Sequence, residues 1–373
     1  MNIVVDQNIR AAEATFGAHA SLRFMDGRAI RNEHLRDAEA LLVRTATRVD
    51  ETLLRGTPVG FVGTTSIGTD HMDIAWLGRQ GIAWANAPGC NADAAAQYTL
   101  AMAWLACERL DRELAGLAAG VIGCGNVGSR VCTLFRALGM SVVANDPPLT
   151  DAGVEGLVTL DEALARDIVC LHVPLTRSGP YPTHRFIGRE QLGRMRPGAL
   201  LLNTARGDVV HGDALLGELR SGRLHAALDV WPGEPLIDAA LLEATTVATP
   251  HVAGYSDDGK RQGTLMVYAA FCAWAGLTPV APPEPPGAAP RLHVEAGKNA
   301  LPQAMDAACF VRRHDAAMRL LTGLSIERRA QEFDRLRREY PPRRDFQAWR
   351  IECADLESAR LCHHVGFTAT AAT

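Results

Sequence analysis

The chain has 373 residues, 47% of them hydrophobic and 21% charged, so it is long enough to build two or three domains with separate cores. Lysine and arginine total 38 against 42 aspartate and glutamate residues, and a net charge of −4 argues against a general nucleic-acid-binding surface. No apolar run is long enough for a membrane span, and the first residues lack the pattern of a signal peptide. We therefore expect a cytoplasmic protein that binds neither membrane nor nucleic acid.

Short apolar runs alternate with helical patterns along most of the chain. The expected strands are residues 3–5, 40–43, 61–64, 120–122, 141–144, 168–172, 199–203, 226–230 and 246–248. This alternation predicts an α/β protein with parallel sheets covered by helices on both faces. Residues 97–117 are expected to form one long helix that crosses from a first group of strands to a second.

A glycine-rich loop follows the first strand of the second group. The sequence G-C-G-N-V-G at residues 123–128 opens a helical pattern over 129–138, and the next strand leads to Asp146. This order is typical of dinucleotide binding: Gly123 makes the tight turn, Gly125 lets the backbone approach a pyrophosphate, and Gly128 permits close helix packing. The helix N-terminus offers free N–H groups to the phosphate oxygens.

Asp146 indicates which dinucleotide binds. It lies eighteen residues after Gly128, where its carboxylate can accept both ribose hydroxyls and would repel a 2′-phosphate. No arginine follows directly to compensate for such a phosphate. We expect NAD rather than NADP as the cofactor.

Three later segments place a polar residue just after an expected strand. They are N-T-A-R-G at 203–207, D-V-W-P-G-E-P at 229–235 and T-P-H-V-A-G at 249–254, which carry Arg206, Glu234 and His251. The carboxyl ends of parallel strands share one sheet edge, where α/β proteins bind ligands. We therefore expect these three side chains to converge beside the nicotinamide.

In this order, the motifs resemble those of the D-isomer-specific 2-hydroxyacid dehydrogenase family. Further segments are similar to one branch, whose members oxidise 4-phosphoerythronate in vitamin B6 synthesis; these are residues 64–71, 87–92, 254–256, 333–337 and 340–344. The resemblance implies that NAD takes a hydride from C2 of a small phosphorylated 2-hydroxy acid. Other substrates of the family, namely phosphoglycerate, glycerate or lactate, stay open, as does a non-catalytic NAD-sensing protein of the same fold.

The resemblance also implies roles for the site residues. His251 would take the proton of the substrate hydroxyl, Glu234 would orient the imidazole, and Arg206 would bind the substrate carboxylate. The substrate-binding residues would be Thr45, Ser66 and Tyr255. The cofactor-binding residues would be Gly123, Gly125, Asn126, Val127, Gly128, Asp146, Asp229 and Gly254. Candidates for holding the substrate phosphate are Arg44, Lys260 and Arg261, and no metal site is expected.

Two departures from the family pattern concern the NAD-binding half. Val173 stands where a threonine is common, so a hydroxyl that faces the cofactor is missing. His211 stands where an aspartate often caps the next helix, which predicts a weaker cap.

A proline-rich segment precedes the tail. Six prolines lie between Pro279 and Pro290, a composition that predicts a linker. Beyond it we expect helices over residues 301–313, 325–340 and 356–365 and a strand over 347–353. Eleven arginines between Arg312 and Arg350, against six acidic residues, are interpreted as a solvated helix face or charges at a subunit contact.

The expected architecture is a Rossmann NAD-binding domain inserted in a flavodoxin-like substrate domain, followed by a small C-terminal α/β dimerisation domain. The boundaries are residues 1–108 and 253–280 for the substrate domain, 109–252 for the NAD-binding domain and 281–373 for the C-terminal domain. The resemblance implies a homodimer formed through the C-terminal domain and an active site in the cleft between the other two. The nine cysteines are expected to be reduced, since none forms a Cys-x-x-Cys pair.

Overall fold

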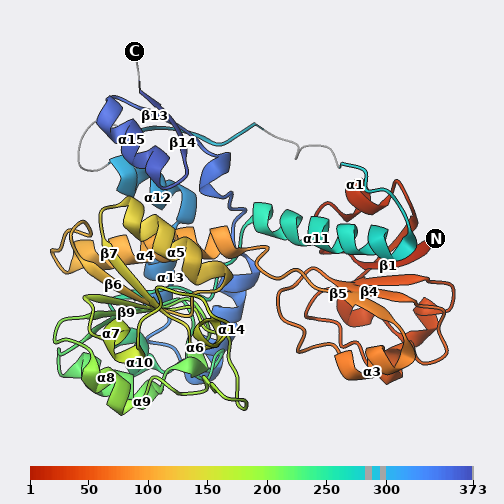
Figure 1. Cartoon of the computed structure of the whole chain (residues 1–373), viewed down its shortest axis with the longest axis horizontal. Coiled ribbons are helices and arrows are strands. Elements are labelled where there is room, and N and C mark those ends of the chain that lie inside the picture. The colour runs from red at the N-terminus through yellow and green to blue at the C-terminus, as the bar shows by residue number, and fades with distance from the viewer. Residues whose placement is uncertain (282–287, 295–299, 372–373) are drawn as a thin grey trace. The chain divides into compact units, whose positions relative to one another are not determined.

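The computed structural model describes residues 1–281, 288–294 and 300–371, and the chain divides into two compact units, each described by itself (Figure 1). Unit 1 comprises Met1–Asn91 with Ser256–Ala288, and unit 2 comprises Ala92–Tyr255 with Ala289–Thr373. Part of the expected proline-rich linker, residues 282–287, lies outside the described residues.

Unit 1 contains a five-stranded parallel sheet. Its strands, in spatial order, are β2 (Ser21–Met25), β1 (Asn2–Asp6), β3 (Ala40–Val43), β4 (Phe61–Thr64) and β5 (Ala83–Ala85). This 2-1-3-4-5 order is the flavodoxin-like order that we expected. The two edge strands, β2 and β5, were not predicted, because their partly exposed residues form no continuous apolar run.

Helices pack against this sheet through their apolar faces. They are α1 (Ala12–Phe16), α2 (Glu51–Leu54), α3 (Ile74–Gln80) and α11 (Asp257–Ala275). Helix α11 packs against β4 and β5, and its Val267 and Phe271 are fully buried in one core with Phe16 and Phe61. Residues far along the chain therefore complete the first sheet's core.

Unit 2 contains a six-stranded parallel sheet. Its strands, in spatial order, are β11 (Val247–Ala248), β10 (His225–Leu228), β9 (Leu200–Asn203), β8 (Ile168–Leu171), β6 (Ala118–Ile122) and β7 (Ser141–Asn145). The chain runs outward from β6 to β7, then returns to β8 on the other side of β6. The carboxyl ends of β6 and β8 therefore flank the switch point where such sheets bind ligands.

The NAD-binding part of unit 2 contains several helices, and the first of them is long and mostly buried. They are α4 (Ala92–Arg109), α5 (Asn126–Ala137), α6 (Pro147–Asp151), α7 (Leu160–Leu164), α8 (Arg189–Arg194), α9 (Gly212–Arg220) and α10 (Ala239–Ala244). The expected helix over 97–117 is wrong at its C-terminal end, because the backbone at Asp111 turns left-handed, with φ of 52°. Helix α4 also groups with unit 2, whereas we had expected it in the substrate domain.

The C-terminal module is a small α/β arrangement. Its parallel sheet has the order β12 (Arg291–Val294), β13 (Arg350–Cys353) and β14 (Thr368–Ala371), and its helices are α12 (Ala300–Cys309), α13 (Val311–Arg319), α14 (Ile326–Arg338) and α15 (Leu356–His364). The single helix expected over 301–313 is broken at Phe310, whose φ is 57°. Strands β12 and β14 were not predicted.

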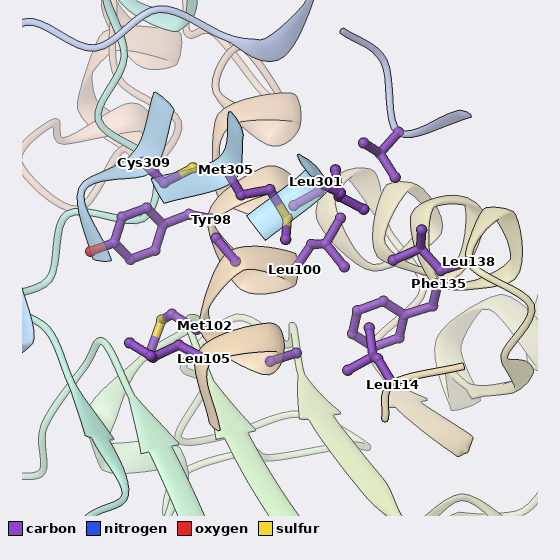
Figure 2. Packing of buried hydrophobic residues seen from close by; sticks show 14 of the residues in the cluster. Tyr98, Leu100, Met102, Leu105, Leu114, Phe135, Leu138, Leu301, Met305 and Cys309 are labelled. Atoms are coloured by element: carbon purple, nitrogen blue, oxygen red, sulfur yellow. The ribbon is translucent and has the colours of Figure 1, made fainter. Parts of the chain in front are cut away.

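The module shares a core with the NAD-binding part of unit 2. Figure 2 shows Leu301 and Met305 of α12 packed around Leu100 of α4, while Phe135 of α5 lies on the other side. Short 3₁₀ helices complete the structure at Gly27–Ala29, Asn32–Leu35, Gly207–Val209 and Phe346–Ala348.

The expected solvated arginine face is wrong for three tail arginines. Arg329 and Arg343 are only 7% and 2% exposed, and Arg319 is half-buried. Each donates hydrogen bonds to backbone carbonyls of the NAD-binding part. These side chains therefore fasten the C-terminal module to the rest of unit 2.

All nine cysteines are free thiols. Within residues 1–281, 288–294 and 300–371, no group of three or more His, Cys, Asp or Glu side chains is arranged to bind a metal ion. None of the helices in those ranges is long and apolar enough to cross a membrane.

Candidate active site

The glycine loop connects β6 to α5 at the switch point of the second sheet. Gly123 has φ of 88°, and a Cβ there would lie 2.8 Å from the His172 carbonyl. A Cβ on Gly128 would overlap the Gly123 carbonyl, so the loop closes tightly on the helix. Gly125 faces open space, since an added Cβ would meet nothing within 4 Å. The exposed N-terminus of α5 thus has room for a pyrophosphate against its N–H groups, which fits NAD.

Asp146 lies at the rim of this loop. Its Oδ2 accepts a hydrogen bond from Cys124 N–H at 2.8 Å, and its Oδ1 accepts one from Leu149 N–H at 3.2 Å as the N-cap of α6. Each carboxylate oxygen has a second lone pair that can accept a ribose hydroxyl. The predicted NAD-selecting carboxylate is therefore fixed next to the predicted pyrophosphate loop.

Arg206 projects from a loop that Asn203 shapes. The buried Asn203 amide donates to the Arg206 carbonyl at 3.0 Å and accepts from Ala205 N–H at 3.0 Å. A Cβ on Gly207 would overlap the Trp231 carbonyl, so this loop is pressed against the segment that leads to Glu234. The Arg206 side chain is exposed, and its Nη1 donates to the Ala205 carbonyl at 2.7 Å, so the other N–H groups of the guanidinium can bind a substrate carboxylate.

Glu234 and His251 form a hydrogen-bonded pair. Glu234 Oε1 accepts from His251 Nδ1, and Glu234 Oε2 accepts from Trp231 N–H at 3.0 Å. The buried Trp231 indole donates to the Thr249 carbonyl at 2.9 Å, which joins the two segments that carry the pair. Because an ionised carboxylate only accepts, Nδ1 bears the proton and Nε2 is the ring nitrogen that can react with a substrate.

The pKa of Glu234 reflects two opposing causes. Burial is the largest single cause and raises the pKa of this carboxyl. The hydrogen bond and charge of His251, with smaller contributions from Trp231 N–H and Arg337, together lower the pKa by more. The net pKa lies below the usual value of 4.5, so Glu234 is ionised at neutral pH. An ionised partner stabilises the imidazolium that forms when His251 accepts a proton.

Asp229 is the buried anchor of the His251 segment. Its Oδ1 accepts from Thr249 Oγ1 at 2.6 Å and from Val252 N–H at 3.0 Å, and its Oδ2 accepts from Ala253 N–H at 2.9 Å. These bonds hold His251 itself in the left-handed region, with φ of 58°. The cofactor contact that we predicted for Asp229 stays a prediction, and the carboxylate is 1% exposed.

The other predicted residues of unit 2 lie near these loops. Tyr255 follows Gly254 and packs edge-on against Tyr340, with ring centroids 5.7 Å apart. The Val173 side chain lies beside Gly123. His211 does cap α9, since its Nδ1 accepts from Ala214 N–H, although the distance of 3.4 Å is long.

Thr45 and Ser66 belong to unit 1, where each follows the carboxyl end of a neighbouring strand. Val43 of β3 is paired with Thr64 of β4, and each predicted residue comes two positions after its strand's member of that pair. In the second turn of α11, a Cβ on Gly263 would lie 2.9 Å from the Thr65 carbonyl. The helix start that carries Lys260 and Arg261 therefore lies at the same sheet edge as the loop of Thr45 and Arg44.

The structure thus brings Glu234 and His251 into contact and packs the Arg206 loop against the Glu234 segment. Three residues that build this arrangement, Asn203, Trp231 and Thr249, were not among the predicted site residues. All three stand inside the motifs that we used, but their hydrogen bonds are set by folded geometry.

Comparisons with known proteins agree with these observations. A family model for the NAD-binding domain of D-isomer-specific 2-hydroxyacid dehydrogenases matches residues 89–253, and one for a domain of unknown function (DUF3410) matches residues 283–366. A D-lactate dehydrogenase structure from Aquifex aeolicus, complexed with NAD and lactic acid, is 28% identical with a TM-score of 0.59, and covers 74% of this chain and 96% of that one.

Relatives that extend through the C-terminal module are more similar. The erythronate-4-phosphate dehydrogenase of Azotobacter vinelandii is 44% identical and covers 97% of both chains. The enzyme of the same name from Hahella chejuensis is 42% identical and covers 94% of both. The chain belongs to the erythronate-4-phosphate dehydrogenase family, within the D-isomer-specific 2-hydroxyacid dehydrogenases.

Proposed function

We propose that the protein oxidises 4-phospho-D-erythronate to (R)-3-hydroxy-2-oxo-4-phosphooxybutanoate, a step of vitamin B6 synthesis. The hydrogen bond between Glu234 and His251 carries this proposal, because it leaves Nε2 as the basic ring nitrogen. Full-length similarity to erythronate-4-phosphate dehydrogenases supports the choice of substrate.

The reaction removes a hydride from C2 and a proton from the C2 hydroxyl. When bound, NAD would be held by the loop of residues 123–128 and by Asp146, and it would supply the hydride acceptor. His251 Nε2 takes the proton, and the carboxylate of Glu234 stabilises the imidazolium. Arg206 binds the substrate carboxylate through its guanidinium fork and stabilises negative charge on the C2 oxygen.

The substrate phosphate needs positive charge. We assign this role to Arg44, Lys260 and Arg261, since the strand register and the position of α11 gather them at one edge of the unit 1 sheet. We also propose that Thr45, Ser66 and Tyr255 contact the substrate. The cofactor contacts would come from Gly123, Gly125, Asn126, Val127, Gly128, Asp146, Asp229 and Gly254.

We further propose a cytoplasmic homodimer joined through the C-terminal module. Nine free thiols favour a reducing compartment. Two large apolar side chains of the module, Leu320 and Leu356, are 78% and 57% exposed, which fits a surface covered by a second subunit. Light scattering on the purified protein measures the mass of the assembly directly.

A substrate panel tests the function. The protein is incubated with NAD and, separately, 4-phospho-D-erythronate, 3-phosphoglycerate, D-glycerate and D-lactate, and NADH is followed by its absorbance. We expect the highest kcat/KM with 4-phospho-D-erythronate. Greater turnover of an unphosphorylated acid would contradict the substrate assignment, and binding of NAD without turnover of any acid would favour an NAD sensor.

A further inference from the structure

We propose that the C-terminal module, described over residues 288–294 and 300–371, positions the Glu234–His251 pair through the buried guanidinium groups of Arg329 and Arg343. This inference rests on the proposed function and adds positioning residues to it. The two arginines fix the backbone on the C-terminal side of each member of the pair.

Arg329 fixes the Glu234 segment. From α14 it donates from Nη1 to the Ile237 carbonyl at 2.7 Å, three residues beyond Glu234. Its Nη2 and Nε donate to carbonyls of its own module, Leu324 at 2.7 Å and Leu321 at 3.2 Å. One planar group thereby links the turn after Glu234 to the turn before α14.

Arg343 fixes the His251 segment. Its Nη2 donates to the Ala253 carbonyl at 2.9 Å, two residues beyond His251, and to the Ala94 carbonyl of α4 at 2.9 Å. The guanidinium lies over the Tyr98 ring, 5.2 Å from its centroid. The His251 segment is therefore connected to the central helix of unit 2 through a tail residue.

The module also fixes the backbone before His251. Asp315 of α13 is 3% exposed, and its Oδ1 accepts from Ala248 N–H at 2.8 Å, at the end of β11. Arg109 and Arg319 neutralise this carboxylate, with nitrogen–oxygen distances of 2.6 Å and 2.9 Å. His251 thus lies between two backbone positions, 248 and 253, that side chains of the C-terminal module hold.

This arrangement affects catalysis because Glu234 and His251 come from separate loops. Their hydrogen bond depends on the relative position of residues 234–237 and 248–253, and a displacement of about 1 Å can lower a rate by about 10²-fold. Removing a guanidinium takes its hydrogen-bond donor away from the Ile237 or the Ala253 carbonyl. Lysine keeps the charge but lacks the planar fork that spans several acceptors.

The first experiment compares Arg329→Met and Arg343→Met with Arg328→Met, which removes the exposed neighbour of Arg329. We expect the two buried variants to lose about tenfold or more in kcat, with KM for substrate and affinity for NADH changed less than about twofold. The Arg328→Met variant should equal the wild type. The kcat values of Arg343→Lys and Arg329→Lys should lie between those of the methionine variants and that of the wild type. If a methionine variant does not fold, the corresponding lysine variant is judged by the same criteria.

A double-mutant cycle separates positioning from stability alone. If Arg329 acts through Glu234, Arg329→Met should reduce kcat of a Glu234→Gln enzyme by less than about twofold, since the effects of coupled residues do not add. A full tenfold effect in both backgrounds would overturn the proposal. So would a loss of activity that merely follows the fraction of unfolded protein.

Hydrogen–deuterium exchange tests the proposal without turnover. Amides of residues 228–237 should exchange faster in Arg329→Met, and those of 248–255 faster in Arg343→Met, while Arg328→Met matches the wild type. Unchanged exchange in both segments would refute the positioning role. A wild-type protein that turns over no hydroxy acid would instead refute the proposed function.

Discussion

Glu234 Oε1 accepts the hydrogen bond of His251 Nδ1, and seventeen residues of chain separate the two side chains. The carboxylate therefore fixes which imidazole nitrogen carries a proton before any substrate binds.

Replacing Glu234 by glutamine should lower kcat by about 10²-fold with little change in NADH affinity, because a neutral amide no longer stabilises the imidazolium. Steady-state kinetics and NADH fluorescence titration measure both quantities. Glu243→Gln, in the exposed part of α10, is the matched control and should leave kcat unchanged. Equal activity of the two variants would show that the pair is structural.

Asp146→Ala should change the cofactor preference. Loss of the carboxylate removes the ribose acceptor and the charge that repels a 2′-phosphate, so kcat/KM with NAD should fall by about tenfold while the value with NADP rises. Asp213→Ala, at an exposed position of α9, should leave the NAD to NADP ratio unchanged. A ratio unaffected by Asp146→Ala would remove this residue from the cofactor site.

Two buried histidines should make the fold sensitive to acid. Burial lowers the pKa of His172 to about 3, and burial together with the charges of Arg343 and Arg313 lowers the pKa of His314 to about 3. Between the ordinary value of 6.5 and 3 the unfolded chain binds protons that the folded protein does not, so stability falls as pH decreases through this range. At pH 5 each histidine should lower the free energy of unfolding by about 2 kcal/mol.

Chemical denaturation at pH 7.5 and pH 5 checks this expectation. A His314→Asn variant should lose less stability between the two pH values than the wild type. His363→Asn, at an exposed position of α15, should show the wild-type difference. If His314→Asn and the wild type lose the same stability, His314 is not neutral in the folded protein.

Gly207→Ala should destabilise the protein by about 1–3 kcal/mol, since the added methyl group would overlap the Trp231 carbonyl. It should also reduce kcat, because the Arg206 loop and the Glu234 segment meet there. Gly217→Ala lies within α9 with open space around it, and it should stabilise the fold by about 0.5–1 kcal/mol. In thermal unfolding, the melting temperature should be lower than that of the wild type for Gly207→Ala and higher for Gly217→Ala.

The central strands and the glycine loop could be predicted from the sequence, because each buried strand is a continuous apolar run and the spacing of Gly123, Gly125 and Gly128 has a direct geometric meaning. The edge strands β2, β5, β12 and β14 could not, since partial exposure breaks that pattern. The end of α4 depends on a left-handed Asp111, for which the neighbouring residues gave no signal.

The candidate catalytic residues could be predicted because each follows a strand that ends at one sheet edge. The roles of Arg329 and Arg343 could not, because their acceptors at Ile237 and Ala253 lie 92 and 90 residues away in the chain. Arginine-rich composition favoured a solvated surface, whereas the fold brings distant carbonyls to these guanidinium groups.

The most direct test of the account compares His251→Ala with the wild type, using NAD and 4-phospho-D-erythronate. We expect unchanged NADH affinity and a decrease in kcat of about 10²- to 10⁴-fold, since the base is lost while the glycine loop is intact. Turnover at the wild-type rate without the imidazole would contradict the assignment of His251 as the base.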